Sequence, residues 1–107
     1  MLKNIYEYHA NVCKVLANPK RLEILNFLRN NELTVTELVK FMKIPKANIS
    51  QHLTIMKDTG ILDSRRAGKN VFYKISNKKV IKAFDLMREV LIENHAKRNE
   101  ILTKVGE

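Results

Sequence analysis

The sequence predicts a mainly α fold with a small β-hairpin, in the order α-α-α-α-β-β-α, and three observations lead to this prediction. Residues 2–59 carry runs of apolar residues at helical spacing, separated by short polar breaks. Residues 61–75 are typical of two short strands around a glycine-containing turn. Residues 77–104 then return to helical spacing. At 107 residues the chain is long enough for one small domain, so we expect residues 1–107 to form a single one.

Basic residues exceed acidic ones in this chain. The 20 Lys and Arg against 11 Asp and Glu give a formal net charge of +9, which favours a polyanionic partner, either nucleic acid or a membrane surface. The excess is concentrated in residues 43–74, which hold seven basic and two acidic residues, whereas residues 1–42 and 75–107 each carry a net charge of +2. A solvated, soluble surface is the alternative explanation.

Composition also argues against several classes of protein. No apolar run reaches the roughly 18 residues of a membrane span, and residues 1–13 are too polar for a signal peptide. A single cysteine, Cys13, allows no internal disulfide, which favours a cytoplasmic protein. Three scattered histidines and three glycines form neither a catalytic triad nor a phosphate-binding loop, so we expect no enzyme and no cofactor.

The first two helices are predicted from apolar spacing and from a proline. Residues 2–16 form an amphipathic helix that ends near Ala17, because the residue before a proline is disfavoured in a helix. Asn18 can cap the next helix with Pro19 at its first position, and this helix is expected over Pro19–Arg29. Its predicted core residues are Leu22, Ile24, Leu25 and Leu28, with Phe27 shared.

Residues 34–59 predict two helices joined by a tight turn. Thr34 and Glu37 form a capping box for a short helix over Val35–Met42. Its core side is expected to hold Leu38 together with Val39 or Phe41. Lys43-Ile44-Pro45 makes the turn, and the following helix begins at Pro45 or Lys46 and runs to about Thr59.

This following helix has two distinct faces. Ile49, Leu53 and Met56 are spaced four and three residues apart and predict a buried inner stripe. Gly60 is expected to end the helix in the left-handed conformation. The polar residues that fall away from the stripe are Lys46, Asn48, Ser50, Gln51, Thr54 and Lys57.

A basic hairpin and a long helix complete the chain. The hairpin, or wing, spans residues 61–75, with a turn over residues 67–70 in which Gly68 allows a tight reversal. The last helix is capped by Ser76 or Asn77. Its apolar residues are Val80, Phe84, Met87 and Leu91, with a second set at Ile81, Leu86, Val90 and Ile92. A helix this apolar on all sides is expected to pack on its own domain and on a partner.

These elements in this order are most simply a winged helix-turn-helix, which places a helix in the major groove of duplex DNA. The predicted DNA-binding residues are Lys46, Asn48, Ser50, Gln51, Thr54, Lys57, Arg65, Arg66 and Lys69. Gln51 suits a bidentate contact with adenine, whereas Lys46 and Lys57 suit phosphates. His52 adjoins Leu53 and either supports the helix from a half-buried position or contacts DNA. Two alternatives to DNA contact remain open. Residues 50–52 could be exposed polar residues with no binding partner, and the wing arginines could belong to a hairpin that is simply solvated.

Several motifs together resemble the ArsR/SmtB family of bacterial and archaeal winged-helix repressors. The resembling segments are residues 16–25 (LANPKRLEIL), 33–38 (LTVTEL), 49–53 (ISQHL), 60–62 (GIL) and 65–73 (RRAGKNVFY). The resemblance implies a homodimer through the first and last helices, residues 1–17 and 77–104. It also implies repression at an inverted-repeat operator, relieved by an inducer whose identity is open.

The familiar metal sites of that family lack their ligands here. Thr34 and Thr36 stand where one site would have cysteines, and hydroxyls bind soft metals poorly. Asp85 matches the first ligand of a second site, but Met87 replaces a histidine, and Arg98 and Ile101 occupy its distal positions. We therefore expect no metal at either site.

A few groups keep other signals open. His9 and Cys13 lie one turn apart, and His95 could approach them in a dimer, so these three residues are the remaining metal candidates. Cys13 could instead respond to oxidation, or be a small buried hydrophobe. The alternative functions are thus a thiol- or redox-responsive repressor acting through Cys13, a winged helix that binds protein rather than DNA, and a membrane-surface role.

Overall fold

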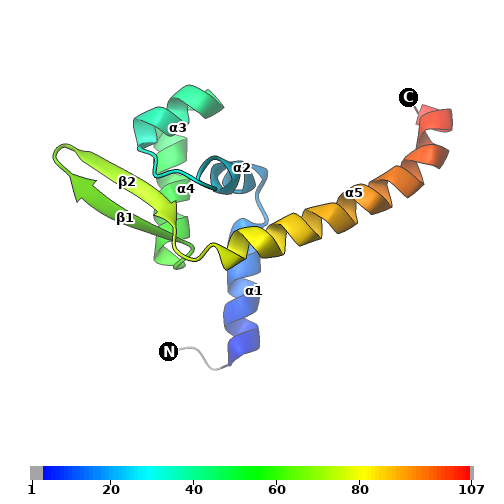
Figure 1. Ribbon diagram of the computed structural model, residues 1–107, viewed down its shortest axis with the longest axis horizontal. Helices are drawn as coiled ribbons and strands as arrows, with labels where there is room; N and C mark the ends of the chain where they lie inside the picture. Colours follow the sequence, from blue (N-terminus) through cyan, green and yellow to red (C-terminus); the bar gives the residue numbers. More distant parts are fainter. Residues whose placement is uncertain (1–3, 107) are drawn as a thin grey trace.

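The computed structural model describes residues 4–106, with side chains described for residues 4–98. Helices α2, α3 and α4 form a compact centre from which the hairpin projects on one side and α5 on the other (Figure 1). The elements in chain order are α1 (Ile5–Leu16), α2 (Pro19–Phe27), α3 (Val35–Met42), α4 (Lys46–Asp58), β1 (Leu62–Ala67), β2 (Asn70–Ile75) and α5 (Lys79–Gly106). The predicted fold class and element order are confirmed.

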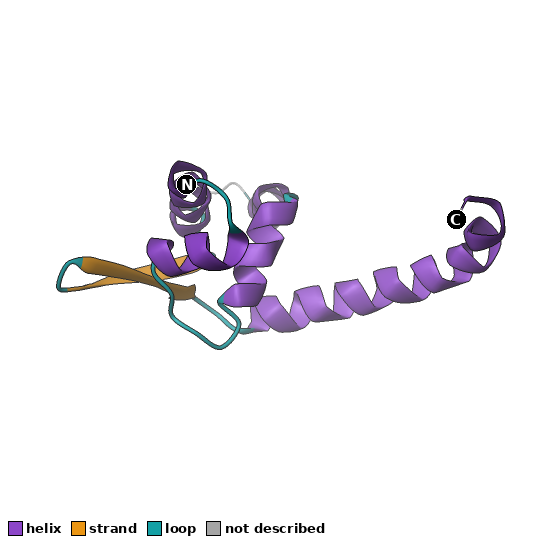
Figure 2. Ribbon diagram, turned by 90° about the horizontal axis from the view of Figure 1, so that it is seen from above, coloured by secondary structure: helices purple, strands orange, loops and turns teal. Residues whose placement is uncertain are grey.

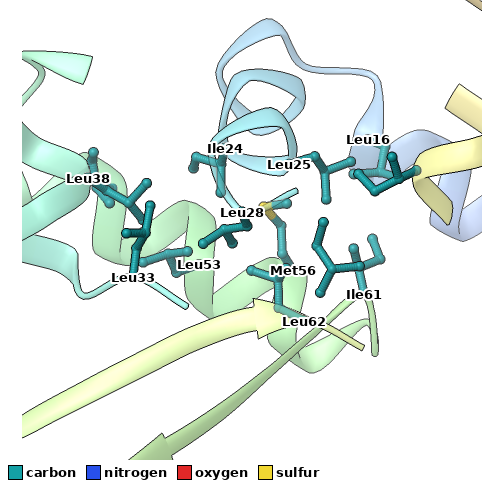
Figure 3. Packing of buried hydrophobic residues seen from close by; sticks show 13 residues of the cluster. Leu16, Ile24, Leu25, Leu28, Leu33, Leu38, Leu53, Met56, Ile61 and Leu62 are labelled. Carbon is teal, nitrogen blue, oxygen red and sulfur yellow. The ribbon is translucent and has the colours of Figure 1, made fainter. Parts of the chain in front are cut away.

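One cluster of buried apolar side chains joins the helices to the base of the hairpin (Figure 3). Ile49, Leu53 and Met56 of α4 are each 0% exposed, which confirms the predicted inner stripe. The other members are Leu16, Ile24, Leu25, Leu28, Leu33, Leu38, Ile61, Leu62, Ile75 and Ile81. Because α1, α2, α3, α5 and both strands all contribute, the position of α4 is set by the whole core.

The predicted caps are present and explain where the helices begin. The Asn18 side-chain oxygen accepts hydrogen bonds from the backbone N–H groups of Lys20 and Arg21, at 2.9 and 3.2 Å. At α3 the Glu37 N–H donates to Thr34 Oγ1 at 3.2 Å, and the Thr34 N–H donates to Glu37 Oε1 at 2.9 Å. This reciprocal pair is the capping box, and it occupies the Thr34 side chain with a structural task.

Three helices have boundaries that differ from the predicted ones. Helix α2 ends at Phe27 rather than Arg29, because the chain tightens there and the Arg29 N–H bonds to Asn26 O, three residues back, at 3.2 Å. Helix α1 begins at Ile5 with Asn4 as its cap; residue 2, its predicted start, lies outside the described residues. Helix α5 spans residues 79–106 instead of 77–104, since the Asn77 side chain caps it at the Lys79 N–H.

One predicted core residue is less buried than expected, and one open choice is decided by the packing. Leu22 is half-buried. Of the two candidates on α3, Phe41 is 52% exposed and stacks on the Phe27 ring with centroids 5.5 Å apart. Phe41 is excluded from the core because the buried face of α3 centres on Leu38 and Met42, which lie one turn apart. The core therefore takes Val39, rather than Phe41, as the second predicted residue of α3.

The hairpin is antiparallel, with a register running from the Leu62–Ile75 pair to the Ala67–Asn70 pair. The predicted four-residue turn is thus shortened to Gly68 and Lys69, and Gly68 takes a left-handed φ of +64°. Leu33 forms an isolated bridge with Tyr73 through hydrogen bonds of 3.1 and 2.8 Å. This bridge attaches the α2–α3 connection to the hairpin and adds a short third segment to the sheet.

Helix α5 projects away from the other elements over most of its length, as the view from above shows (Figure 2). Among the α5 residues whose side chains are described, 79–98, those that pack on the core lie in the first turns: buried Ile81 and half-buried Val80 and Phe84. Among residues 4–106, no helix has the length and apolar character needed to cross a membrane.

Candidate nucleic-acid interface

Helix α4 presents an outer face opposite its buried stripe. Ala47, Gln51 and Thr54 repeat the four-and-three spacing of Ile49, Leu53 and Met56 but are offset by two residues, about 200° around a helix. All three outer residues are exposed. Because the inner stripe is fully buried, this outer face is fixed toward solvent, the orientation that a helix entering a groove requires.

The predicted base- and phosphate-contacting residues of α4 divide by exposure. Lys46, Asn48, Gln51, Thr54 and Lys57 are exposed and Ser50 is half-buried. The Thr54 hydroxyl donates its proton to the Ser50 carbonyl oxygen at 2.9 Å, so Thr54 can offer DNA only its oxygen lone pairs and its methyl group. Ser50 lies at the edge of the outer face rather than at its centre.

Two features of this surface were missed by the sequence analysis. Ala47 lies in the middle of the outer face, where its small side chain lets a partner approach the backbone closely. Pro45, the N-cap residue of α4, offers no side chain to the first N–H groups of the helix, and such helix ends attract phosphate. Ala47 could have been found from the sequence, because it lies four residues before Gln51 and so shares its face of the helix. The lack of a side-chain cap on α4 could also have been found, because proline has no polar side chain.

The angle between α3 and α4 depends on Lys43. Its backbone is left-handed, with φ of +56°, and its N–H donates to Val39 O at 2.8 Å. A non-glycine residue is uncommon in this conformation. The turn therefore stops α3 abruptly and lets α4 begin at Lys46 after only two further residues, Ile44 and Pro45, as a helix-turn-helix requires.

The three basic residues of the wing are not equivalent. Arg65 and Arg66 point to opposite faces of β1, because side chains alternate along a strand. The Arg65 guanidinium donates to both carboxylate oxygens of Glu32 at 2.9 Å, and it lies 4.9 Å from the centroid of the Phe72 ring. Arg66 and Lys69 are exposed, and neither takes part in an ion pair among the described residues.

The Glu32–Arg65 pair anchors the wing to the body. Hydrogen bonding from Arg65, aided by the positive charges of Arg65 and Lys74, lowers the pKa of Glu32, so this carboxylate stays ionised. Together with the Leu33–Tyr73 bridge, the pair holds the hairpin against the α2–α3 connection. Glu32 was not among the site residues predicted from the sequence, because 33 residues separate it from Arg65 and no local pattern links the two.

His52 lies on the side of α4 that faces α2. Its half-buried ring accepts a hydrogen bond at Nδ1 from Arg21 Nε, at 3.1 Å, which confirms the half-buried alternative. Burial lowers the pKa of His52 and the nearby charge of Arg21 lowers it further, so the neutral imidazole is favoured. His52 therefore forms a hydrogen bond with α2 and does not lie on the exposed outer face of α4.

The residues considered for a metal lie apart from any ligand cluster. His9, Cys13 and His95 are exposed, and residues 4–98 contain no group of three or more His, Cys, Asp or Glu side chains able to hold an ion. Asp85 accepts two hydrogen bonds from the Arg29 guanidinium, at 2.7 and 2.8 Å. Hydrogen bonding from Arg29, joined by its charge, lowers the pKa of Asp85, so an ion pair occupies this carboxylate.

An apolar groove of about 280 Å³ separates α1 from the base of α5. Its lining is His9, Val12, Cys13, Leu16, Val80, Ala83, Phe84 and Met87. Cys13 is exposed at this groove, so within a single chain it is not the buried hydrophobe considered above.

A short helix, a tight turn, a second helix with a polar outer face and an attached basic hairpin define a winged helix-turn-helix DNA-binding protein. Comparison with known proteins agrees. The profile described as "Bacterial regulatory protein, arsR family" matches residues 18–64. The transcriptional repressor PagR of Bacillus anthracis is 37% identical over 75 residues, which cover 69% of this chain and 75% of PagR.

Solved structures show the same architecture over more of the chain. The crystal structure of Rv0081 from Mycobacterium tuberculosis aligns with a TM-score of 0.80 and 28% identity, over 91% of this chain and 98% of that one. The homodimeric winged helix-turn-helix domain of Mb0332 from Mycobacterium bovis, titled a possible ArsR-family regulator, aligns with a TM-score of 0.76 and 30% identity, covering 83% and 82%. The chain belongs to the ArsR family of transcriptional regulators, and its relatives are regulators rather than enzymes.

Proposed function

We propose that this protein is a cytoplasmic, dimeric repressor that binds an inverted-repeat operator through α4 and the wing and dimerises through α1 and α5. The whole chain acts as one DNA-binding domain. The observation that carries the proposal is the pairing of a fully buried inner stripe on α4 with an exposed polar outer face beside a basic hairpin.

The DNA-binding part assigns a separate role to each group of residues. Gln51 and Asn48 contact base edges in the major groove, with Ser50 and Thr54 beside them. Lys46 and Lys57 bind phosphates on either side of the groove, and Arg66 and Lys69 bind the backbone near the wing. Arg65, which Glu32 already holds, contributes mainly by orienting the hairpin.

The dimer part is supported by apolar surface that one chain leaves uncovered. Leu86, Met87, Val90, Leu91 and Ile92 of α5 are all exposed, and the apolar groove between α1 and α5 lies at the near end of this row. Monomeric proteins seldom expose so continuous an apolar surface. The neighbour Mb0332 is described as homodimeric. A second copy of α1 and α5 would cover this surface and place two α4 helices about one DNA turn apart.

The experiment that tests the proposal measures duplex binding against salt concentration, using DNA from upstream of the protein's own gene. Binding through several phosphates predicts that log Kd rises linearly with log salt concentration. Light scattering in the same buffer should give twice the chain mass. An affinity without salt dependence, or a monomer at the concentrations that bind DNA, contradicts the proposal.

Whether the protein represses or activates transcription needs a separate test. The relative PagR is named a repressor, and a repressor that overlaps its promoter blocks transcription. Deleting the gene should therefore raise expression of a reporter fused to the bound promoter. A fall in expression would make the protein an activator, with the same DNA-binding surface.

A second candidate function is favoured by the exposure of Cys13. In this alternative, oxidation of the thiol at the groove between α1 and α5 releases the protein from DNA. Titration of the bound complex with peroxide, compared between the parent and Cys13→Ser, decides the question. Equal release from both proteins removes thiol sensing.

A further inference from the structure

Arg21 connects three helices at the back of the DNA-binding surface. Its Nη1 donates to the Val15 carbonyl oxygen at 2.9 Å, and its Nε donates to His52 Nδ1 at 3.1 Å. Val15 lies in the last turn of α1, where carbonyl groups lack partners within the helix. A single side chain of α2 thus joins the end of α1 to α4.

The hydrogen bond to His52 depends on the protonation state of the imidazole. Arg21 Nε–H is the donor, so His52 Nδ1 must carry no proton in order to accept this hydrogen bond. The bond therefore requires a neutral His52 with its proton on Nε2. A proton taken from solvent by Nδ1 turns that acceptor into a donor. The bond is then lost, and two positive charges face each other across 3.1 Å.

Among the described residues, His52 takes part in no ion pair that would compensate a protonated ring. Burial of the ring lowers the pKa of His52, and the charge of Arg21 on α2 lowers it further. Helix α1 contributes the uncharged Val15 carbonyl, which Arg21 already occupies. Protonation must therefore be relieved by moving Arg21 or α4.

We propose that Arg21 and His52 form a proton-sensitive latch that holds recognition helix α4 in register with α1, so that protonation of His52 weakens DNA binding. The two residues are positioning residues and contact no DNA. The latch rests on the proposed function, because α1 belongs to the dimer surface and α4 to the DNA surface. Acidification then lowers affinity by changing how the two recognition helices are presented, without altering any DNA-contacting side chain.

The first test is the pH dependence of DNA affinity from about pH 7.5 down to about pH 5, which extends below the ordinary titration midpoint of histidine because burial and Arg21 lower the pKa of His52. Added positive charge by itself tightens DNA binding, whereas the latch predicts weakening of about tenfold in the parent, the typical effect of one charge-assisted hydrogen bond. His52→Asn places an amide oxygen near the Nδ1 position and does not titrate. It should bind like the parent at the higher pH and keep its affinity at the lower one.

Matched controls separate His52 from the other histidines. His9→Asn and His95→Asn should weaken on acidification as the parent does. A pH response that persists in His52→Asn, or a parent whose affinity does not fall, overturns the latch alone. Absence of salt-dependent DNA binding at about pH 7.5 overturns the proposed function and the latch together.

A second measurement does not depend on any variant folding. Coupling is reciprocal, so if protonation weakens DNA binding, bound DNA must lower the pKa of His52. Bound phosphates acting only through their charge would raise it. NMR titration of the imidazole in the free and DNA-bound parent protein therefore gives opposite signs for the two cases. A raised pKa of His52 in the complex overturns the latch.

Discussion

Helices α4 and α5 carry similar apolar patterns with opposite outcomes. In α4, Ile49, Leu53 and Met56 are spaced four and three residues apart, and each is 0% exposed. In α5 the same kind of stripe continues from the domain into solvent, where Met87 is 55% and Leu91 58% exposed. Apolar spacing therefore indicates which face of a helix will be covered, while the position of the helix in the fold determines what covers it.

The reason for the difference is the placement of neighbours. Helix α4 lies among α2, α3 and β1, which surround its inner face. Helix α5 follows the hairpin, and its first turns, around Ile81, pack on the core before the helix leaves the domain (Figure 2). The apolar stripe of α4 therefore stabilises the fold of one chain, whereas the exposed apolar residues of α5 are available to contact a second chain.

Truncation of the α4 stripe should produce the largest effect. Leu53→Ala removes a fully buried side chain, and we expect the free energy of unfolding to fall by about 3–5 kcal/mol, through lost burial and the cavity left behind. Urea denaturation followed by circular dichroism measures this change. Gln51→Ala, on the exposed face of the same helix, should change stability by less than about 0.5 kcal/mol. Similar losses in both variants would show that the two faces are not distinct.

A charge on the α5 stripe should act on assembly instead. Leu91→Asp places a carboxylate in the exposed apolar row, and we expect the chain to remain folded but to become monomeric. Loss of simultaneous binding to two half-sites should then weaken DNA binding by about a hundredfold. Light scattering and DNA titration report the two effects. Glu89→Lys, at an exposed polar position of α5, is the control and should leave the dimer intact.

Substitutions on the outer face of α4 should change recognition rather than folding or assembly. Gln51→Ala is expected to relax preference at one base pair by about tenfold, because a bidentate contact contributes roughly 1–3 kcal/mol of discrimination. Arg66→Ala should weaken all sequences alike and reduce the salt slope by about one. Binding to operator variants at several salt concentrations separates the two. Uniform weakening by Gln51→Ala would place that residue on the DNA backbone.

The smallest effect is expected where α5 leaves the domain, at the Arg29–Asp85 pair. Hydrogen bonding from Arg29 lowers the pKa of Asp85 below its ordinary value of 3.8. The stabilisation it provides is therefore complete above that value and is lost as the pH falls through the lower folded value. Asp85→Asn should shift the urea midpoint slightly downward near pH 7 and produce no shift once the pH lies below the lowered pKa of Asp85. A constant difference across this range would exclude the ion pair as its cause.

Much of the fold could be predicted because its signals are local. The Thr34–Glu37 capping box and Asn18 before Pro19 correctly marked helix starts, and Gly60 takes the left-handed φ of +89° expected at a helix end. The predicted end of α2 at Arg29 was wrong because the last turn of the helix tightens, and no residue type in that turn indicates this. The choice between Val39 and Phe41 stayed open in the sequence because two apolar residues compete for one core side of a short helix, and packing selects Val39.

The candidate site was less predictable wherever contacts join distant segments. All nine DNA-binding residues named from the sequence lie on α4 or the hairpin, but their assignment to DNA stays a prediction. Pairing of Arg65 with Glu32, and of His52 with Arg21, joins residues 33 and 31 positions apart. Nothing in the sequence distinguishes Arg65 from Arg66 of the wing. In the folded chain Arg65 is paired with Glu32 in the body of the protein.

Local spacing, capping and composition are enough to predict the order of elements, the two faces of α4 and the concentration of positive charge in residues 43–74. They do not show which apolar stripe is covered within one chain or which polar groups are already bonded to the protein; the folded structure shows both. Burial and long-range hydrogen bonds depend on the packing of α4 and α5 against their neighbours. That packing fixes the outer face of α4, which we propose for DNA, and leaves an exposed apolar row on α5, which we propose for a second copy of the chain.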